Sequence, residues 1–376
     1  MVQPGLLFTL AVFTVVIGVL VFIHEFGHYG VGRIFGVKAD VFSIGFGREL
    51  FGWNDRRGTR WKIAMLPLGG YVKFAGDMNA ASQPTPEIDN ATAAEKAVMF
   101  QFKPLWQRAL IILAGPVTNF LFAIIVFALF FMTYGQSFTP PVIQTVVSGT
   151  AAAQAKLQPG DRFVQIGGRS IDRFEDVMRI VAANTGTPLA VRIDRHGQAI
   201  ALTIVPKLIA EIDRFGNHYT RGLLGVSPGN RVFEHRSAPA AVAAAVREVW
   251  VLTGTIVDTV EQVVLGRRPV RELGGTIAIA KFSGQQAALG WRNLVQFMAL
   301  ISINLGFINL LPVPVLDGGH LFLYAVEAAR RRPLAPKVQE FAFASGFTAL
   351  MSLMLFLNWN DLVSLGVWKQ LTEMFG

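Results

Sequence analysis

Four long stretches of the sequence contain no charged residue, and this feature restricts the possible fold more than any other. The stretches are residues 6–23, 109–134, 294–316 and 341–357. Each is close to the ~20 residues that a helix needs to cross the hydrocarbon core of a bilayer. We therefore predict an α-helical membrane bundle with four transmembrane helices, over residues 6–28, 109–134, 294–317 and 340–358.

The composition is typical of a membrane protein. Of the 376 residues, 52% are hydrophobic and 16% are charged, whereas about 25% are charged in an average soluble chain. A purely soluble enzyme is therefore excluded. The chain has no cysteine, which excludes disulfides, thiol catalysis and cysteine-ligated metals. Histidine and carboxylate side chains remain as the strong metal ligands.

The distribution of positive charge predicts how the chain crosses the membrane. Lys and Arg are concentrated between the first and second stretches, and again between the third and fourth, at Arg330, Arg331, Arg332 and Lys337. Because short loops rich in Lys and Arg stay cytoplasmic, both loops are predicted to be cytoplasmic. Both termini and the segment between the second and third stretches then lie outside. This topology explains the net charge of +9 better than binding to nucleic acid does.

The outside segment begins with a pattern typical of a compact, mainly β module. Short β runs cover residues 142–147, 162–166, 189–193 and 199–205, with Gly, Pro and Asp between them and a helix at 174–183. We place this module at residues 139–207. It separates an N-terminal membrane part, residues 1–135, from a linker at 208–290 and a C-terminal membrane part at 291–376.

The linker contains a predicted amphipathic helix at residues 240–265. Its apolar residues recur at helical spacing, but Arg247, Glu248, Asp258 and Glu261 interrupt them. The sequence therefore predicts that this helix is too charged to span the membrane. It either packs on the folded module or lies in the membrane–water interface.

Two further segments lie between the first two spans. Residues 60–75 contain two apolar runs around Pro67, Gly69 and Gly70, which predicts a β-hairpin that is either cytoplasmic or dips into the bilayer. Residues 79–90 are rich in Ala, Ser, Pro and Thr, which predicts a flexible loop.

The chemistry of the chain is concentrated in the sequence His24-Glu25-Phe26-Gly27-His28, an H-E-x-x-H motif at the cytoplasmic end of the first stretch. Positions i and i+4 share one face of a helix, so the two imidazoles can bind one zinc ion while Glu25 activates water. Charged groups just inside a bilayer are costly unless they serve a function. The motif therefore predicts a zinc-dependent hydrolase.

A catalytic zinc normally has three protein ligands, so one more is needed. Asp317 is the first charge after the third stretch and should lie at a depth similar to that of His24, which makes it the favoured ligand; His320 is a second candidate. The remaining histidines, which belong to the outside segment and cannot reach this end, are His196, His218 and His235.

The second stretch is interrupted by a Gly-Pro-Val-Thr-Asn sequence that runs from Gly115 to Asn119. It is either a proline kink relieved by neighbouring helices, or a feature through which Asn119 helps to build the site.

Together these motifs resemble the site-2 protease family of intramembrane zinc metalloproteases, and within it the bacterial RseP-type regulator-of-sigma-E proteases. The resemblance covers nearly the whole chain. The matching segments are HEFGH at 24–28, PLGGYVKF at 67–74, FKPLWQRALIILAGPVTNFLFA at 102–123, the PDZ-like PGDRFVQIGG at 159–168, ELGGTIAIA at 272–280 and NLLPVPVLDGGH at 309–320.

The resemblance implies a role for particular residues. It implies Zn²⁺ as cofactor, with His24, His28 and Asp317 as ligands and Glu25 as the catalytic acid/base. It also implies a membrane-associated re-entrant hairpin at 68–73 and a set of residues that contact the substrate. That set is Asn304, Asn309, Pro312, Pro314, Leu68, Gly69, Gly70 and Tyr71.

The resemblance also implies a location and a substrate class. The chain would be a multi-pass protein of the bacterial inner membrane, with both termini and a PDZ-like α+β domain in the periplasm. It would cut single-span membrane proteins in regulated intramembrane proteolysis: an anti-sigma factor after site-1 cleavage, and also signal-peptide remnants. The best-known members have two tandem PDZ modules, whereas this sequence has room for one. Two alternatives are a catalytically silent, PDZ-bearing membrane scaffold and a metal transporter.

Overall fold

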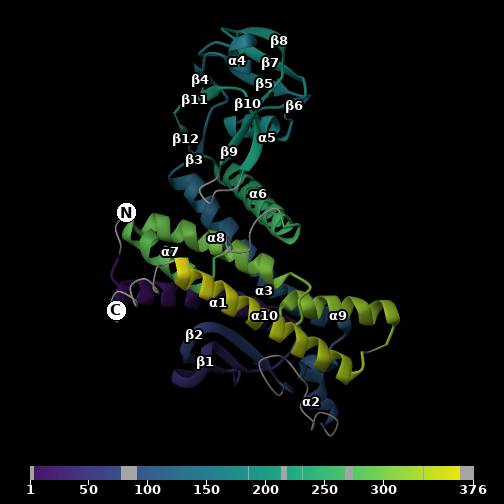
Figure 1. Ribbon diagram of the computed structural model, residues 1–376. Helices are drawn as coiled ribbons and strands as arrows, with labels where there is room; N and C mark the ends of the chain where they lie inside the picture. Colours follow the sequence, from purple (N-terminus) through teal and green to yellow (C-terminus); the bar gives the residue numbers. More distant parts are fainter. Residues whose placement is uncertain are drawn as a thin grey trace, which may run out of the picture. The chain divides into compact units, whose positions relative to one another are not determined.

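The computed structural model describes residues 4–77, 91–184, 186–212, 218–230, 232–266, 274–332 and 334–364. The chain divides into two compact units (Figure 1). The first unit, which we call the helical unit, consists of residues 1–129 and 242–376. The second, which we call the β-rich unit, consists of residues 130–241. Both the predicted loop at 79–90 and the end of the chain after residue 364 lie outside the described residues.

Long apolar helices dominate the helical unit. Four helices in the described part of the chain are long and apolar enough to cross a membrane: α1, α3, α6 and α10. Their bounds are Leu6–Ile34, Leu105–Thr133, Ala238–Val264 and Pro336–Ser364. Shorter helices are α2 (Ala93–Val98), α7 (Thr276–Ala288), α8 (Trp291–Asn309) and α9 (Asp317–Arg330).

The number of candidate spans agrees with the prediction, but their identity differs at one position. By length and composition α6 qualifies as a span, so the expectation that this helix is too charged was wrong. The reason is that its charges occur in two pairs, Arg247–Glu248 and Asp258–Glu261, with a long apolar stretch beside each pair. Helix α8 does not qualify, because Arg292 and several Asn and Gln residues lower its apolar character.

The predicted third span at 294–317 is not one continuous helix. Helix α8 ends at Asn309, residues 310–316 form a turn, and α9 starts at Asp317. The reason is local: Pro312 and Pro314 have no backbone N–H and disfavour helical backbone in the preceding residue. Because of this break, the first turn of α9 is not part of α8 and can face α1.

The hairpin predicted within residues 60–75, with its turn around Pro67, Gly69 and Gly70, was wrong in its bounds. Residues 60–74 form one strand, its partner precedes it in the sequence, and the turn between them is at residues 55–59. The reason is that Gly58 has the positive φ that the turn requires, 80°, whereas Gly69 and Gly70 do not.

Strands β1 (Ala39–Asn54) and β2 (Arg60–Phe74) pair with a strongly shifted register. Residues 41–44 lie between residues 60–63 and residues 70–73 and pair with both. Residues 51–54 pair with the other side of residues 60–63. The stretch 70–73 therefore lies at one edge of this small sheet and pairs on one side only among the described residues.

Aromatic packing fixes the hairpin to α1. The rings of Phe42 and Trp61 stack with centroids 4.2 Å apart, and the ring of Tyr29 on α1 meets both edge-on at 5.2–5.7 Å. Asp55, in the hairpin turn, accepts hydrogen bonds from the Tyr29 hydroxyl and from Trp61 Nε1. Tyr29 directly follows His28, so the hairpin is fixed to the end of the helix that contains the H-E-x-x-H motif.

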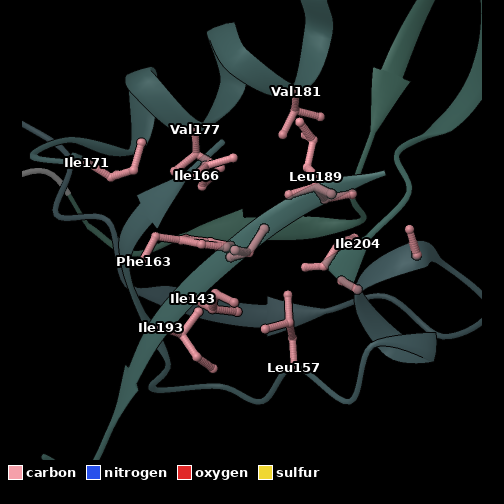
Figure 2. Close-up of a cluster of buried hydrophobic side chains, with 14 of the residues drawn as sticks. Ile143, Leu157, Phe163, Ile166, Ile171, Val177, Val181, Leu189, Ile193 and Ile204 are labelled. Carbon is pink, nitrogen blue, oxygen red and sulfur yellow. The ribbon is translucent and has the colours of Figure 1, made fainter. Parts of the chain in front are cut away.

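The β-rich unit is built around a four-stranded antiparallel sheet. The strand order is β6 (Arg169–Ser170), β5 (Arg162–Ile166), β7 (Leu189–Arg195) and β8 (Gln198–Ile204). Helix α5 (Phe174–Ala183) packs on the sheet, and a short helix α4 (Ala151–Gln154) contributes to the same hydrophobic core. Figure 2 shows the core of this unit, where Phe163, Ile166 and Ile193 are completely buried.

This unit extends beyond the predicted boundary at residue 207. Strand β11 (Val226–Pro228) pairs with β4 (Ile143–Val146), and β12 (Val232–Glu234) pairs with β3 (Gln136–Phe138). Strands β9 (Lys207–Ile212) and β10 (His218–Leu223) form a further pair. Much of the predicted linker is therefore folded, because strands near the end of the unit pair with strands at its beginning.

Candidate metal centre

His24 and His28 form one side of a cluster of metal-binding side chains. Both are buried on α1, and because they are one helical turn apart their Nε2 atoms lie 3.2 Å from each other. The rings meet edge-on at a centroid distance of 4.8 Å. Two ring nitrogens at this separation define a position where both could bind one ion.

Asp317 completes the cluster from a distant part of the sequence. It is the first residue of α9, and its Oδ2 lies 3.1 Å from Nε2 of His24 and 3.5 Å from Nε2 of His28. Among the described residues, His24, His28 and Asp317 are the one group of this kind that could hold a metal ion. His320, the alternative ligand, is not in the group; its ring lies beside Phe343, at a centroid distance of 4.8 Å.

The geometry of the cluster fits tetrahedral zinc. Ligand atoms about 2.0–2.1 Å from a tetrahedral ion are about 3.3 Å apart, and the three separations here are 3.1, 3.2 and 3.5 Å. Oδ2 of Asp317 is buried and accepts no hydrogen bond from the residues that the structure describes, although Nε2 of His24 lies 3.1 Å away, which leaves its lone pairs available to an ion. Nitrogen and carboxylate donors are also the ligand types that zinc uses in catalytic sites.

Helix α3 contacts Nδ1 of both histidines, the ring nitrogen that faces away from the cluster. Nδ1 of His28 lies 2.9 Å from the backbone oxygen of Ile111, and Nδ1 of His24 lies 3.1 Å from Nδ2 of Asn119. Groups that bond to the outer nitrogen of a metal-binding histidine orient its ring. The role of Ile111 could not have been found from the sequence, because its backbone oxygen makes the contact. The Asn119 contact agrees with the functional alternative considered for the Gly115–Asn119 interruption.

Close approach of α1 and α3 depends on glycine. A Cβ atom at Gly27 of α1 would overlap the backbone oxygen of Ala114 on α3. Thr118 of α3 donates a hydrogen bond to the backbone oxygen of Ile23 on α1, at 3.0 Å. The two helices are therefore in direct backbone contact beside the cluster, which explains how α3 can reach the outer nitrogens of the histidines.

Glu25 lies between the cluster and the hairpin. Glu25 as a residue is half-buried, and its carboxylate faces the backbone N–H of Val72 in β2. A Cβ atom at Gly70 would lie 2.5 Å from Cγ1 of Val21 and 3.2 Å from Cγ of Glu25, both on α1, so glycine lets the strand pass this close to the helix. The open edge of the hairpin is therefore next to Glu25.

The other predicted substrate-binding residues lie on two elements. Asn304 and Asn309 are half-buried on α8, and Pro312 and Pro314 are in the turn that leads to Asp317. Gly69 packs under the ring of Phe46, which in turn stacks on Tyr71 at 6.0 Å. The side chain of Leu68 lies outside the described residues. The structure thus brings Gly70 to Glu25 and places the two prolines beside Asp317 along the chain.

Comparison with known sequences matches one protein family and several relatives over most of the chain. The family model for peptidase family M50 matches residues 12–353. The chain is 44% identical, over 94% of its length and 95% of the relative's, to a protein of Agrobacterium fabrum whose name describes it as a zinc metalloprotease. It is 39% identical to metalloprotease MmpA of Caulobacter vibrioides, over 99% of both chains.

Comparison with solved structures matches part of the chain. The PDZ domain of an SdrC-like protein from Listeria innocua covers 26% of this chain and 99% of its own, with a TM-score of 0.20 and 18% identity. The corresponding PDZ domain from Listeria monocytogenes covers 24% of this chain and 88% of its own, with a TM-score of 0.19 and 17% identity.

Proposed function

The chain belongs to peptidase family M50, the site-2 protease family of zinc metalloproteases, and we propose that it cleaves the membrane-spanning segments of single-span proteins. The observation that supports this proposal is the position of the cluster. His24 and His28 lie on α1, a 29-residue helix long and apolar enough to cross a membrane. A peptidase centre built on such a helix suits a substrate that is itself in the bilayer.

In this proposal the zinc ligands are Nε2 of His24, Nε2 of His28 and Oδ2 of Asp317. Zinc held there supplies a Lewis acid that polarises a carbonyl group and makes a neighbouring water more acidic. Glu25 takes the proton of the attacking water and delivers it to the leaving amine. No covalent intermediate with the protein is then required.

A helical substrate must be opened before it can be cut, because its carbonyl groups are bonded within the helix. The edge stretch 70–73 of the hairpin is next to Glu25 and pairs with β1 on one side only among the described residues. An unwound substrate can add to this edge as a further strand and replace its lost helical hydrogen bonds. Asn309 can also bond the extended substrate, while Asn304, Pro312 and Pro314 shape its path.

We also propose the membrane topology and the cellular role. The cytoplasmic loops rich in Lys and Arg place the β-rich unit and both termini in the periplasm of a bacterial inner membrane. The substrates are then an anti-sigma factor already cut outside the membrane, and signal-peptide remnants. In this role the β-rich unit, expected from its sequence to be PDZ-like, excludes substrates that still have a large outer domain.

Cleavage of a tagged transmembrane peptide by the purified protein in detergent tests the proposal. We expect cleavage that stops when a zinc chelator is added, and one tightly bound zinc per chain. Glu25→Gln should keep the zinc and abolish turnover, whereas Glu95→Gln, at an exposed site on α2, should change neither. Full turnover by the Glu25→Gln variant would overturn the mechanism. Several exchangeable ions per chain would instead indicate transport.

A further inference from the structure

The two histidines of the cluster differ in the group that contacts Nδ1, the ring nitrogen that faces away from the cluster. For His28 that group is the backbone oxygen of Ile111, 2.9 Å from Nδ1. A carbonyl oxygen can only accept a hydrogen bond, so Nδ1 of His28 has the proton. In the neutral ring Nε2 then has a free lone pair, which points into the cluster. His28 is thus held in the tautomer that a metal requires.

For His24 the corresponding group is the side chain of Asn119, which is completely buried. Its Nδ2 lies 3.1 Å from Nδ1 of His24, while its Oδ1 is buried without a hydrogen-bond partner in the part of the chain that the structure describes. A carboxamide that donates to Nδ1 leaves the proton of a neutral imidazole on Nε2, the atom that faces His28 and Asp317. That tautomer cannot bind a metal through Nε2.

A half-turn of the carboxamide about its terminal bond exchanges Oδ1 and Nδ2. Oδ1 then accepts the Nδ1 proton of His24, which gives the unpartnered oxygen a donor and turns the lone pair of Nε2 into the cluster. We propose that Asn119 is a positioning residue that selects the metal-binding tautomer of His24 through Oδ1. This inference rests on the proposed zinc centre and adds to it a residue that touches neither zinc nor substrate.

The position of Asn119 on α3 supports this role. Ile111, Gly115 and Asn119 are spaced four residues apart, so they share one face of the helix. All three meet the imidazoles: Ile111 with its oxygen, Gly115 by the absence of a side chain, and Asn119 with its carboxamide. The backbone of Asn119 is itself held from α8, because Ser302 Oγ donates to its backbone oxygen at 2.9 Å.

Zinc affinity of two variants, measured by competition with a chelator, tests the proposal. Asn119→Leu removes the acceptor and should weaken zinc binding on the order of 10–100-fold, as loss of such supporting contacts does. Asn119→Asp keeps an acceptor oxygen at the same place and should bind zinc within a few-fold of wild type. If the carboxamide acted as a donor, Asp would fail as badly as Leu, and the proposal would be overturned.

Two controls separate this inference from the zinc centre and from folding. Thr255→Ala removes an exposed hydroxyl that donates to the backbone oxygen of Val251 on α6, and it should leave zinc affinity unchanged. Wild type that binds no zinc, or His24→Ala that binds it equally well, would overturn the zinc centre itself. If Asn119→Leu does not fold, nitrogen NMR of the zinc-loaded wild type decides: Nδ1 of His24 should have the proton, and an unprotonated Nδ1 would refute the proposal.

Discussion

The carboxylate of Asp361 on α10 accepts a hydrogen bond at 3.0 Å from the backbone N–H of Gly275, at the start of α7. It also accepts one at 2.9 Å from Ala278, and Asn358 on the same helix accepts one from Thr276. The first N–H groups of a helix have no partner within it. Here another helix supplies the cap, and α7 in turn packs against α1.

Replacing Asp361 should therefore loosen α7. We expect Asp361→Ala to cost about 1–2 kcal/mol, the usual cost of removing an N-terminal cap, and to speed hydrogen exchange of the first amides of α7. Asp361→Asn keeps one acceptor oxygen and should lose less. Equal exchange in wild type and Asp361→Ala would show that the cap contributes nothing.

Alanine at position 115 should damage the zinc site. A Cβ atom at Gly115 would overlap Nε2 of His28 and lie 2.9 Å from Cε1 of His24. We expect Gly115→Ala to displace both rings and to reduce bound zinc and peptide cleavage at least tenfold. Gly30→Ala, on α1 just after the motif, is the matched control, because a Cβ there meets no atom within 4 Å. Normal zinc content in Gly115→Ala would contradict the observed packing.

The turn before Asp317 contains backbone strain at Val315, whose φ is 90°. A β-branched residue rarely adopts this conformation, which costs on the order of 1–3 kcal/mol. Glycine adopts it freely, so Val315→Gly should leave the thermal midpoint unchanged or raise it. Val313→Gly, in the same turn without a positive φ, should lower it. A large loss in Val315→Gly would show that side-chain packing outweighs the strain.

The β-rich unit should lose stability in acid through the ion pair between the buried carboxylate of Asp161 and the partly exposed guanidinium of Arg195. Burial raises the pKa of Asp161, but hydrogen bonds from Arg195 and from the Gln158 N–H outweigh it and lower the pKa below its usual value. The pair therefore stabilises the fold above the unfolded pKa of about 3.9, and this stabilisation is lost as the pH falls through the folded value.

We expect Arg195→Met to destabilise the β-rich unit near neutral pH, because the buried carboxylate of Asp161 loses its partner, and to do so progressively less below pH ~4. Amide exchange in β5 and β7, compared with wild type at each pH, measures the difference. Arg179→Met is the control, since that side chain is 66% exposed in its pair with Asp176 and surface pairs contribute little. A loss of stability in Arg195→Met that is the same at every pH would show that the ion pair with Asp161 does not cause it.

Local features were predictable because their geometry depends on neighbouring residues. The positions of His24 and His28 follow from helical spacing alone. Strand β5 and helix α5 lie at the residues predicted for them. Three of the four candidate spans also follow from charge-free length. The hairpin was not predictable in this way, because residues 60–74 pair with the more distant residues 39–54 and not with one another.

Features that depend on distant contacts were not predictable in the same way. Sequence alone favoured Asp317 as the third ligand and kept His320 as a second candidate, since both follow α8 at nearly the same place. The fold shows which of them meets the histidines, because the turn at 310–316 brings Asp317 to His24 and leaves His320 beside Phe343. The β-rich unit likewise extends past residue 207 because β11 and β12 pair with strands more than one element away.

The sequence by itself thus determined that the chain is a membrane protein in which one helix presents two histidines on one face, because hydrophobicity and helical spacing act over a few neighbouring residues. The tertiary structure decided which carboxylate joins that helix and which residues of α3 hold its imidazoles. Those contacts join residues 83 and 95 positions apart. They form only when whole helices pack, so no local pattern of residues specifies them.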